Sequence, residues 1–232
     1  MDTPQNTKYV YYPARISRIE KPFGDTRTFF VTTNGGERPP FTAGHSLHLV
    51  APGAPLEKPF VRHMSIAALP DDEELVFSMD LSSGSPYKEL FRKAEVGDEV
   101  TLFKVRGHFV VEDLPEGTRI VFIAGGIGIT PVRSLIRRIE IGRLDLPWRL
   151  VYVGRNYLFR DEFSSYPNPQ EYIGRADVPG ALDRLTADAA GVPGAGETRY
   201  FVTGSHSFVE SLSEELMKRG AAEHQIRTED FR

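Results

Sequence analysis

The architecture of this chain follows from Thr118-Arg-Ile-Val-Phe-Ile-Ala-Gly-Gly-Ile-Gly-Ile-Thr-Pro131, an apolar run that passes directly into a glycine-rich turn. The run Thr118–Ala124 has the length and composition of a strand that is buried on both faces. Apolar residues then recur at helical spacing, at Val132, Leu135, Ile136 and Ile139. This spacing predicts a helix with Thr130 as its N-cap and Pro131 in its first position. Strand, glycine turn and helix in this order begin a parallel βαβ unit.

The three glycines of the turn, Gly125, Gly126 and Gly128, predict a phosphate-binding site. Glycine lets the backbone turn sharply and approach a phosphate closely, and a helix start offers free N–H groups and the positive end of the helix dipole. A pyrophosphate is the ligand that this arrangement favours. The alternative is a purely structural turn, because a glycine-rich turn alone is weak evidence.

Downstream, the alternation of strands and helices continues. The predicted strands are Arg149–Gly154, Arg199–Thr203 and Gln225–Phe231, and the predicted helices are Ala181–Ala189 and Phe208–Arg219. Ser207 and Glu210 form a capping-box pattern for the last helix, and Gly220 ends it. Residues 164–170 carry no periodic pattern and are predicted to form a loop. This alternation predicts a doubly wound parallel sheet over residues 113–232.

Upstream, short runs of β-branched and aromatic residues are separated by turn residues. Six runs are predicted to be strands, at Lys8–Ile19, Thr26–Thr33, Ser46–Val50, Arg62–Ala67, Glu74–Leu81 and Glu99–Lys104. One helix interrupts them, with Ser85 as N-cap, Pro86 in the first position and Tyr87–Lys93 as its body. Six short strands at this spacing predict a small antiparallel barrel over residues 1–112. The domain boundary is predicted within Val111–Gly117.

The composition narrows the classes of function. The 232 residues contain no cysteine, which excludes disulfides, thiolate zinc sites and iron–sulfur clusters held by cysteines of these residues. The formal net charge of −4 offers no basic excess for nucleic acid. No apolar run reaches the roughly 18 to 20 residues of a membrane span, and Met1–Lys8 lacks the pattern of a signal peptide. The histidines show no metal-ligand spacing, so a cytoplasmic protein without a metal is expected.

Two segments of the first half carry groups suited to anions. Arg62-His63-Met64-Ser65-Ile66 ends a predicted strand, and a guanidinium suits a phosphate bidentately. Gly84-Ser85-Pro86-Tyr87 opens the predicted helix, with Lys88 nearby to add charge. Taken singly, the first has an exposed strand as its alternative and the second a plain helix cap.

Together with the glycine turn, these segments resemble the ferredoxin–NADP reductase family. Arg62-x-Met64-Ser65 is similar to the family's flavin motif Arg-x-Tyr-Ser. Gly125–Pro131 is similar to its nicotinamide pyrophosphate loop Gly-Gly-x-Gly-Ile-Thr-Pro. Thr203-Gly204-Ser205, a helix, and Ile226-x-x-Glu229-x-Phe231 are similar to its closing Cys-Gly-Pro … Glu-x-aromatic pattern. The resemblance covers nearly the whole chain.

The resemblance implies a flavin-binding antiparallel barrel followed by a doubly wound NAD(P)-binding domain, with nicotinamide and flavin meeting between them. FAD is the implied flavin, with FMN as the alternative. Arg62 would hold the flavin phosphate and Ser65 would lie near N5, and the other implied flavin contacts are His63, Met64, Ile66, Gly84, Ser85, Lys88, Thr130 and Phe231. The implied NAD(P)H contacts are Gly125, Gly126, Gly128, Thr130, Arg155, Arg160, Gly204 and Ser205. The catalytic roles fall to Ser65, Thr203 and Glu229.

The chain departs from the family pattern at three places. Met64 stands where the family usually has an aromatic that packs on the flavin, and a thioether can pack on a ring as well. Thr203 replaces the familiar cysteine, which exchanges a soft contact for a hydroxyl. Between residues 163 and 198 the chain is too short for the usual helix–strand–helix series, so an abbreviated sheet is expected there.

Arginines of the second half bear on the choice of nucleotide and of partner. Val153-Gly154-Arg155-Asn156 contains no acidic residue to hold a free ribose 2′-OH, whereas Arg155 and Arg160 suit a 2′-phosphate. This favours NADPH over NADH. Three more arginines lie on the helix after the glycine turn, at Arg133, Arg137 and Arg138. They suit an acidic partner, but a solvated basic face is the favoured interpretation.

The predicted function is transfer of a hydride from NAD(P)H to a bound flavin, followed by electron transfer to a ferredoxin, a flavodoxin or an oxygenase. Such a reaction needs aligned reactants rather than a strong acid or base, which agrees with the lack of a catalytic dyad or triad. Two alternatives stay open. One is a flavin reductase that releases reduced free flavin, and the other is a non-enzymatic electron-relay subunit of a larger complex.

Overall fold

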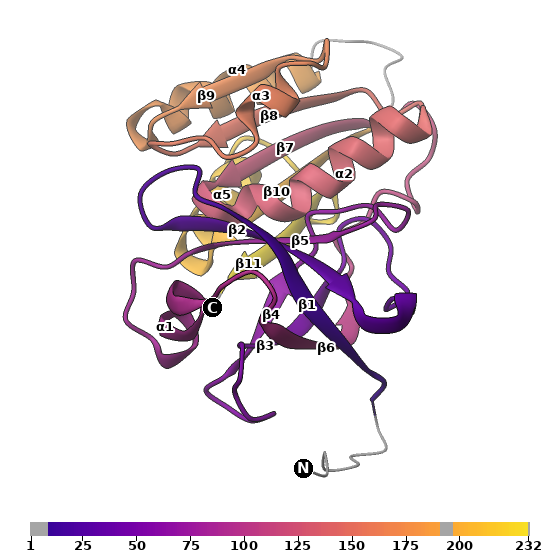
Figure 1. The fold of residues 1–232 in the computed structure, drawn as a ribbon. Coiled ribbons are helices and arrows are strands. Elements are labelled where there is room, and N and C mark those ends of the chain that lie inside the picture. The colour runs from indigo at the N-terminus through magenta and orange to yellow at the C-terminus, as the bar shows by residue number, and fades with distance from the viewer. Residues whose placement is uncertain (1–8, 191–196, 232) are drawn as a thin grey trace. The chain divides into compact units, whose positions relative to one another are not determined.

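The computed structural model describes residues 9–190 and 197–231. The chain falls into two compact units, Met1–His108 and Phe109–Arg232, each with a sheet of its own (Figure 1). The interpretation of Met1–Lys8 and the first residue of the first predicted strand lie outside the described residues. None of the helices in the described ranges has the length and hydropathy of a membrane span.

The first unit is built on one antiparallel sheet of six strands. The strands are β1 (Tyr11–Glu20), β2 (Thr26–Thr33), β3 (Ser46–Val50), β4 (Val61–Ser65), β5 (Leu75–Asp80) and β6 (Glu99–Arg106), in the order β4-β3-β6-β1-β2-β5. Just after β4, the N–H of Ala67 donates to the carbonyl of Val76 in β5 at 2.9 Å. This bond joins the two edges of the sheet, as the predicted barrel requires. The predicted six-stranded antiparallel architecture is confirmed.

One helix, α1 (Pro86–Lys93), packs on this sheet. Ser85 is its N-cap, and the Ser85 side chain accepts a bond from the Lys88 N–H at 3.4 Å, as predicted. The Phe91 ring lies 5.0 Å from that of Phe29 in β2 and 4.9 Å from that of Tyr87. Aromatic packing therefore fixes the start of α1 against the sheet. A short 3₁₀ turn, η1 (Asn34–Gly36), follows β2.

The second unit is built on a parallel sheet with helices on both faces, as predicted. Its strands are β7 (Arg119–Gly125), β8 (Trp148–Val153), β9 (Gln170–Ile173), β10 (Thr198–Ser205) and β11 (Ile226–Phe231), in the order β11-β10-β7-β8-β9. The helices are α2 (Ile129–Gly142), α3 (Arg160–Phe163), α4 (Val178–Ala190) and α5 (His206–Lys218). Short 3₁₀ turns are η2 (Gly126–Gly128), η3 (Arg175–Asp177) and η4 (Glu223–Gln225).

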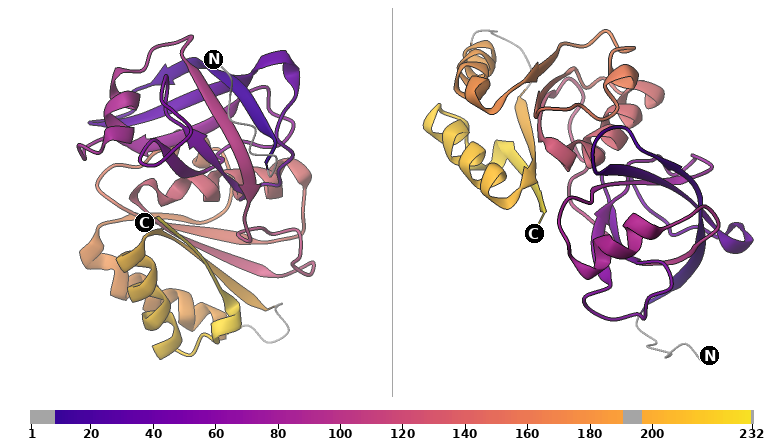
Figure 2. Two further views of the ribbon diagram at one scale, coloured as in Figure 1. Left: turned by 90° about the horizontal axis from the view of Figure 1, so that it is seen from below. Right: turned by 60° about the vertical axis from the view of Figure 1, so that its left-hand side comes forward.

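Alternation along β7 explains how this sheet is covered on both sides. Val121 and Ile123 pack in one core with Leu182 of α4 and Leu212 of α5. Alternate residues of a strand point to opposite faces, so Phe122 faces the other side, where α2 lies (Figure 2). The predicted apolar face of α2 is confirmed, because its four residues are at most 3% exposed: Val132, Leu135, Ile136 and Ile139.

Strand β9 and helix α3 correct the prediction of an abbreviated sheet. Residues 164–169 are the loop that the sequence predicts, but Gln170 already belongs to β9. All four side chains of β9 are only half-buried. An edge strand this short offers too few residues for a period to show, so only its pairing with β8 defines it.

The two predicted helix caps of the second unit are also wrong. Helix α2 begins at Ile129 rather than after Thr130, because the turn η2 leads straight into it. The Thr130 hydroxyl instead donates to the Ile127 carbonyl at 3.0 Å. Helix α5 begins at His206 with Ser205 as N-cap, so the capping box placed two residues later does not form. The predicted end at Gly220 holds, since that glycine has a φ of +96°.

Residues 109–112 belong to the second unit, whereas the predicted limit of 1–112 places them in the first. The Phe109 ring lies 5.0 Å from that of Phe201 in β10. Arg227 of β11 donates to the Val110 carbonyl and, twice at 2.9 Å, to the Asp113 carboxylate. These bonds from Arg227 lower the pKa of Asp113. A ring contact and an ion pair thus tie this segment to β10 and β11.

Candidate functional site

The carboxyl ends of the parallel strands bring together residues that are far apart in the sequence. Thr203 of β10 pairs in register with Ala124 of β7 on one side and Glu229 of β11 on the other. Gly125 pairs with Val153 at the end of β8. The strand order reverses between β7 and β10, and ligands of doubly wound sheets bind beyond such a point. The predicted NAD(P)H residues therefore share the edge of the sheet where a nucleotide is expected.

A different structural constraint favours glycine at each of the three positions of the predicted phosphate turn. Gly126 has a φ of +53° and open space where a Cβ would lie. A Cβ on Gly128 would lie 2.6 Å from the carbonyl oxygen of Thr203, so this turn presses directly on the end of β10. A Cβ on Gly125 would lie 2.8 Å from the ring of Phe208 in α5. The turn is thus closed against β10 and α5 by close contact.

Tyr152 of β8 holds this turn through a hydrogen bond, a role that no sequence motif predicted. Its hydroxyl donates to the Gly126 carbonyl at 3.0 Å and accepts from the Leu158 N–H at 3.2 Å. Burial raises the pKa of Tyr152, so the hydroxyl keeps its proton. The only available indication in the sequence was a hydroxyl-bearing aromatic inside an otherwise aliphatic strand.

Thr203 carries a buried hydroxyl for which the fold supplies no partner. The residue is 0% exposed, and its Oγ1 makes no hydrogen bond with any described residue. Leaving such a group unpaired costs about 1–3 kcal/mol, which a native structure retains for a reason. An ordered water or a ligand that accepts this hydrogen bond would be such a reason.

Glu229 and its neighbours complete this edge of the sheet. Glu229 is half-buried and lies in register with Thr203. The next residue, Asp230, pairs with His206 at the start of α5, and Phe231 pairs in register with the exposed Ser205. Successive side chains of a strand point to opposite faces, so Glu229 lies on the other face of the sheet from Asp230 and its partner His206.

The two arginines predicted for the 2′-phosphate differ in how they are held. Arg155 follows β8 and is exposed. The Arg160 guanidinium lies 4.7 Å from the ring centre of Tyr172 and 5.8 Å from that of Tyr157. The two tyrosine rings are 5.0 Å apart, edge to face. Arg160 thus lies against an aromatic pair made by Tyr157, which follows β8, and Tyr172 of β9, although nothing in the sequence joins the two tyrosines.

The predicted solvated basic face on α2 does not form. Arg133 and Arg137 both pair with Glu162 of α3, at 2.7 and 3.4 Å, and their side chains are only 14% and 16% exposed. Arg138 pairs with Glu112 at 3.2 Å. These arginines tie α3 and the start of the second unit to α2, a use that only the fold reveals.

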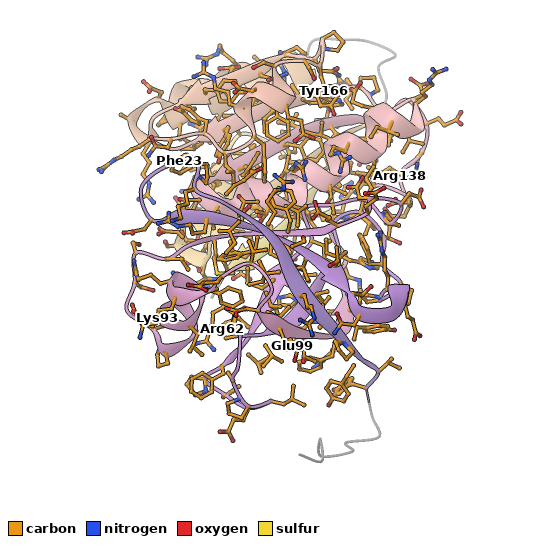
Figure 3. The ribbon with its side chains drawn as sticks, viewed as in Figure 1. Phe23, Arg62, Lys93, Glu99, Arg138 and Tyr166 are labelled. Atoms are coloured by element: carbon orange, nitrogen blue, oxygen red, sulfur yellow. The ribbon has the colours of Figure 1, made fainter. Side chains whose placement is uncertain are left out.

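In the first unit, β4 separates the predicted flavin residues onto two faces. Arg62 and Met64 pair in register with Leu49 and Leu47, which are completely buried. The Arg62 guanidinium lies 5.6 Å from the ring centre of Tyr87, beside the start of α1 (Figure 3). The structure therefore brings Arg62 next to the segment that holds the other predicted anion-binding residues, Gly84, Ser85 and Lys88.

The opposite face of β4 carries His63. Its Nε2 lies 2.6 Å from the Ser46 hydroxyl and accepts from Arg106 Nε at 3.3 Å. Desolvation, followed by the charge of Arg106, lowers the pKa of His63 to about 4. The imidazole is neutral near pH 7 and engaged with β3 and β6. The structure thus does not group His63 with Arg62 and Met64.

Two more buried hydroxyls of the first unit have no hydrogen-bond partner among the described residues. One is Ser65 at the end of β4, which is 6% exposed and precedes the fully buried Ile66. The other is Tyr87, which the sequence analysis missed and which is 2% exposed. Both belong to the segments predicted to hold the flavin, and such orphaned donors fit a bound polar ligand.

Removing the orphaned hydroxyls should stabilise the ligand-free protein. Thr203→Val and Ser65→Ala each delete a buried polar atom with little change of shape, so we expect the free energy of unfolding to rise by about 1 kcal/mol. Chemical denaturation of the ligand-free chain measures this. Ser46→Ala serves as the control, because the Ser46 hydroxyl is bonded to His63 and to the Arg106 carbonyl, and its loss should destabilise. Destabilisation by Thr203→Val would show that this hydroxyl already has a partner.

No metal centre forms in the part of the chain that the structure describes, where no three His, Asp or Glu side chains gather closely enough to hold an ion. The candidate site consists of two regions predicted to bind anions, one in each unit. The first lies between β4 and the start of α1, and the second lies beyond the carboxyl ends of β7, β8 and β10.

Comparison with known proteins finds reductase subunits of oxygenases among the relatives of this chain. No family model matches the chain. It is 26% identical over 233 residues to the carnitine monooxygenase reductase subunit of Escherichia coli K12, covering 96% of this chain and 69% of that protein. It is 30% identical over 153 residues to the phthalate 4,5-dioxygenase oxygenase reductase subunit of Pseudomonas putida, covering 63% of this chain and 45% of that protein.

The fold matches that of a solved reductase. The ferredoxin NADP⁺ reductase of Neisseria gonorrhoeae, determined with bound FAD and NADP, superposes with a TM-score of 0.77 at 21% identity. The match covers 96% of this chain and 98% of that one. An antiparallel barrel followed by a doubly wound parallel sheet is thus an architecture that the two proteins share.

Proposed function

We propose that this chain, a homologue of the ferredoxin–NADP reductase-like reductases, is a flavin-dependent oxidoreductase that accepts a hydride from NAD(P)H. The observation that carries the proposal is the glycine turn after β7, closed against β10 at the point where the strand order reverses. A turn of this kind binds a pyrophosphate with backbone N–H groups and the helix dipole. The relatives, which are reductase subunits and a reductase solved with FAD and NADP, support the same assignment.

The first unit fits a flavin. Arg62 and the start of α1 at Pro86 form a site for the flavin phosphates, with one guanidinium and the positive end of a helix dipole. The half-buried Met64 would pack on the ring, and Ser65, which lies on the other face of β4, would meet the ring edge where the strand ends. A flavin, when bound, supplies the acceptor for two electrons from NAD(P)H.

The second unit fits NAD(P)H. Gly126 and Gly128 would cradle the pyrophosphate, and Thr203 and Glu229 would bind the nicotinamide end of the molecule. The protein's contribution to the reaction is positioning, because hydride transfer needs the donor carbon and the acceptor nitrogen aligned and sheltered from water. The orphaned Thr203 hydroxyl and the carboxylate of Glu229 supply the polar contacts for this task.

We expect the purified chain to be yellow and to release FAD on acid denaturation. FAD is favoured over FMN because both Arg62 and the start of α1 offer phosphate contacts. Chromatography of the released flavin, followed by anaerobic addition of NADPH and then NADH under a visible spectrum, measures flavin identity and reduction together. FMN as the only flavin would contradict the FAD assignment, and failure to bind any flavin would contradict the proposed function.

We expect Arg155→Ala to raise the KM for NADPH about tenfold and to leave the KM for NADH nearly unchanged. A charge-assisted contact to phosphate is worth roughly 1.5–3 kcal/mol, and the exposure of Arg155 favours the lower end. Steady-state kinetics with both nucleotides measures the split. Arg175→Ala, at an exposed arginine after β9, is the control. Equal losses with NADPH and NADH would mean that Arg155 does not bind the 2′-phosphate.

The acceptor of the electrons is proposed to be an oxygenase or a ferredoxin-type protein, in line with the names of the relatives. The 232 residues hold no cysteine, so an acceptor cluster ligated by cysteines lies outside them. Reduction of a purified [2Fe–2S] ferredoxin, compared with reduction of free FMN, tests the proposal. Turnover with free FMN alone would identify a flavin reductase instead.

A further inference from the structure

Phe208 of α5 lies against the glycines at the ends of β7 and β10. Its ring is half-buried and packs against the apolar core beneath α5. A Cβ built on Gly125, at the end of β7, would lie 2.8, 2.9 and 3.0 Å from three atoms of this ring. A Cβ built on Gly204, at the end of β10, would lie 2.8 Å from the same ring. One aromatic ring therefore fills the space that two side chains would need.

The backbone of Gly125 does not itself require glycine. Its φ of −102° and ψ of 118° are ordinary extended values that any residue adopts. The three atoms nearest to its Cβ position all belong to Phe208. The Phe208 ring also packs against the apolar core cluster, and this packing restricts its movement away from Gly125. Phe208 is therefore what excludes a side chain at Gly125.

The other two glycines of the turn have different constraints. Gly126 adopts a φ of +53°, which strains any other residue even in open space. A Cβ built on Gly128 would lie 2.6 Å from the carbonyl oxygen of Thr203, a backbone clash that no side-chain substitution elsewhere can relieve. Only the constraint on Gly125 can be removed by changing one distant side chain.

We propose that Phe208 is a positioning residue of the NAD(P)H site, an inference that rests on the proposed function. Its ring is a spacer that fixes the turn after β7 against the end of β10. The backbone N–H groups of that turn are thereby set for the pyrophosphate, and the end of β10 is set for the nicotinamide end. Gly125 belongs to the motif because of this ring and not because of the nucleotide. Phe208 itself need not touch the ligand.

The test compares Gly125→Ala, Phe208→Ala and the double variant with the wild-type chain. Gly125→Ala overpacks a held ring, so we expect its melting temperature to fall by roughly 3–10 °C and its Kd for NADP⁺ to rise roughly 5- to 100-fold. In the Phe208→Ala background the same glycine substitution should change neither quantity. Such a result is a non-additive double-mutant cycle.

Phe208→Ala alone should weaken NADP⁺ about threefold or more and leave the flavin content unchanged, since the lost contact lies only in the second unit. Gly128→Ala is the matched control, because the block at Gly128 is backbone and Phe208→Ala should not relieve it. Calorimetric titration with NADP⁺, which avoids turnover, and thermal unfolding of the ligand-free chain give two independent measurements. Phe208→Leu replaces the alanine variant if that variant does not fold.

Three results would contradict the inference in distinguishable ways. Equal effects of Gly125→Ala with and without Phe208 would show that the ring does not exclude a side chain there. If the two substitutions have non-additive effects on the melting temperature but Phe208→Ala binds NADP⁺ with wild-type affinity, the ring has a packing role only. A wild-type chain that binds neither NADP⁺ nor NAD⁺ would overturn the proposed function, while the thermal cycle would still report whether the ring and Gly125 are coupled.

Discussion

Reduction of the bound flavin by NAD(P)H is expected to be on the order of 10²-fold slower in Glu229→Gln than in the wild-type chain. Glu229 is half-buried at the carboxyl end of β11, in register with Thr203, and only β10 lies between its strand and the strand of the glycine turn. A carboxylate held at this edge, where water is partly excluded, orients a carboxamide or stabilises developing charge more strongly than it would in bulk water. Glutamine keeps the size of the side chain and removes the charge, so the loss measures the charge.

The fold and the flavin content should survive this substitution. Glu229 lies in the last strand of the second unit and is not part of its buried core. Glu223→Gln, the same change at an exposed carboxylate just before β11, is the matched control and should reduce at the wild-type rate. Anaerobic stopped-flow mixing with NADPH measures reduction directly, free of the identity of the acceptor. A wild-type rate in Glu229→Gln would leave Thr203 and Ser65 as the polar groups of the reaction.

The affinity for flavin is expected to fall roughly 10- to 150-fold in Arg62→Met, because charge-assisted hydrogen bonds to phosphate are worth about 1.5–3 kcal/mol. Arg62 is half-buried, donates to the Val61 carbonyl of its own strand and lies over the ring of Tyr87. Methionine keeps an apolar stem over that ring, so the loss of charge is separated from the loss of packing. The free energy of unfolding of the ligand-free chain should change little.

Titration of the flavin-free chain with FAD, followed by flavin fluorescence, measures this affinity. Lys93→Met, at the exposed far end of α1, removes one positive charge from the same helix and is the control (Figure 3). Arg62→Lys is informative as well, because it keeps the charge but loses the bidentate fork, and an intermediate Kd is expected. An unchanged Kd in Arg62→Met would place the flavin phosphates elsewhere in the first unit.

Short-range patterns were enough to predict both architectures. The bounds of β2 and β3 were predicted to the residue, as were the N-cap of α1 at Ser85 and the buried face of α2. Each of these depends on a period of 2.0 or 3.6 residues or on a cap next to the helix it begins, and such information is local. The order of the motifs along the chain then indicated the barrel and the doubly wound sheet.

Contacts between distant segments decided the remainder, and no local pattern encodes them. Strand β9 exists through its pairing with β8, and the arginines of α2 are held by Glu162 of α3 rather than by solvent. The contacts of His63 with Ser46 and Arg106 depend on the pairing of β4, β3 and β6. The sequence showed three glycines with one expected role. In the fold, Gly125 faces the Phe208 ring, Gly126 faces open space and Gly128 faces the Thr203 carbonyl. Phe208 and Thr203 lie about 80 positions further along the chain, so only the tertiary structure brings them to the glycines.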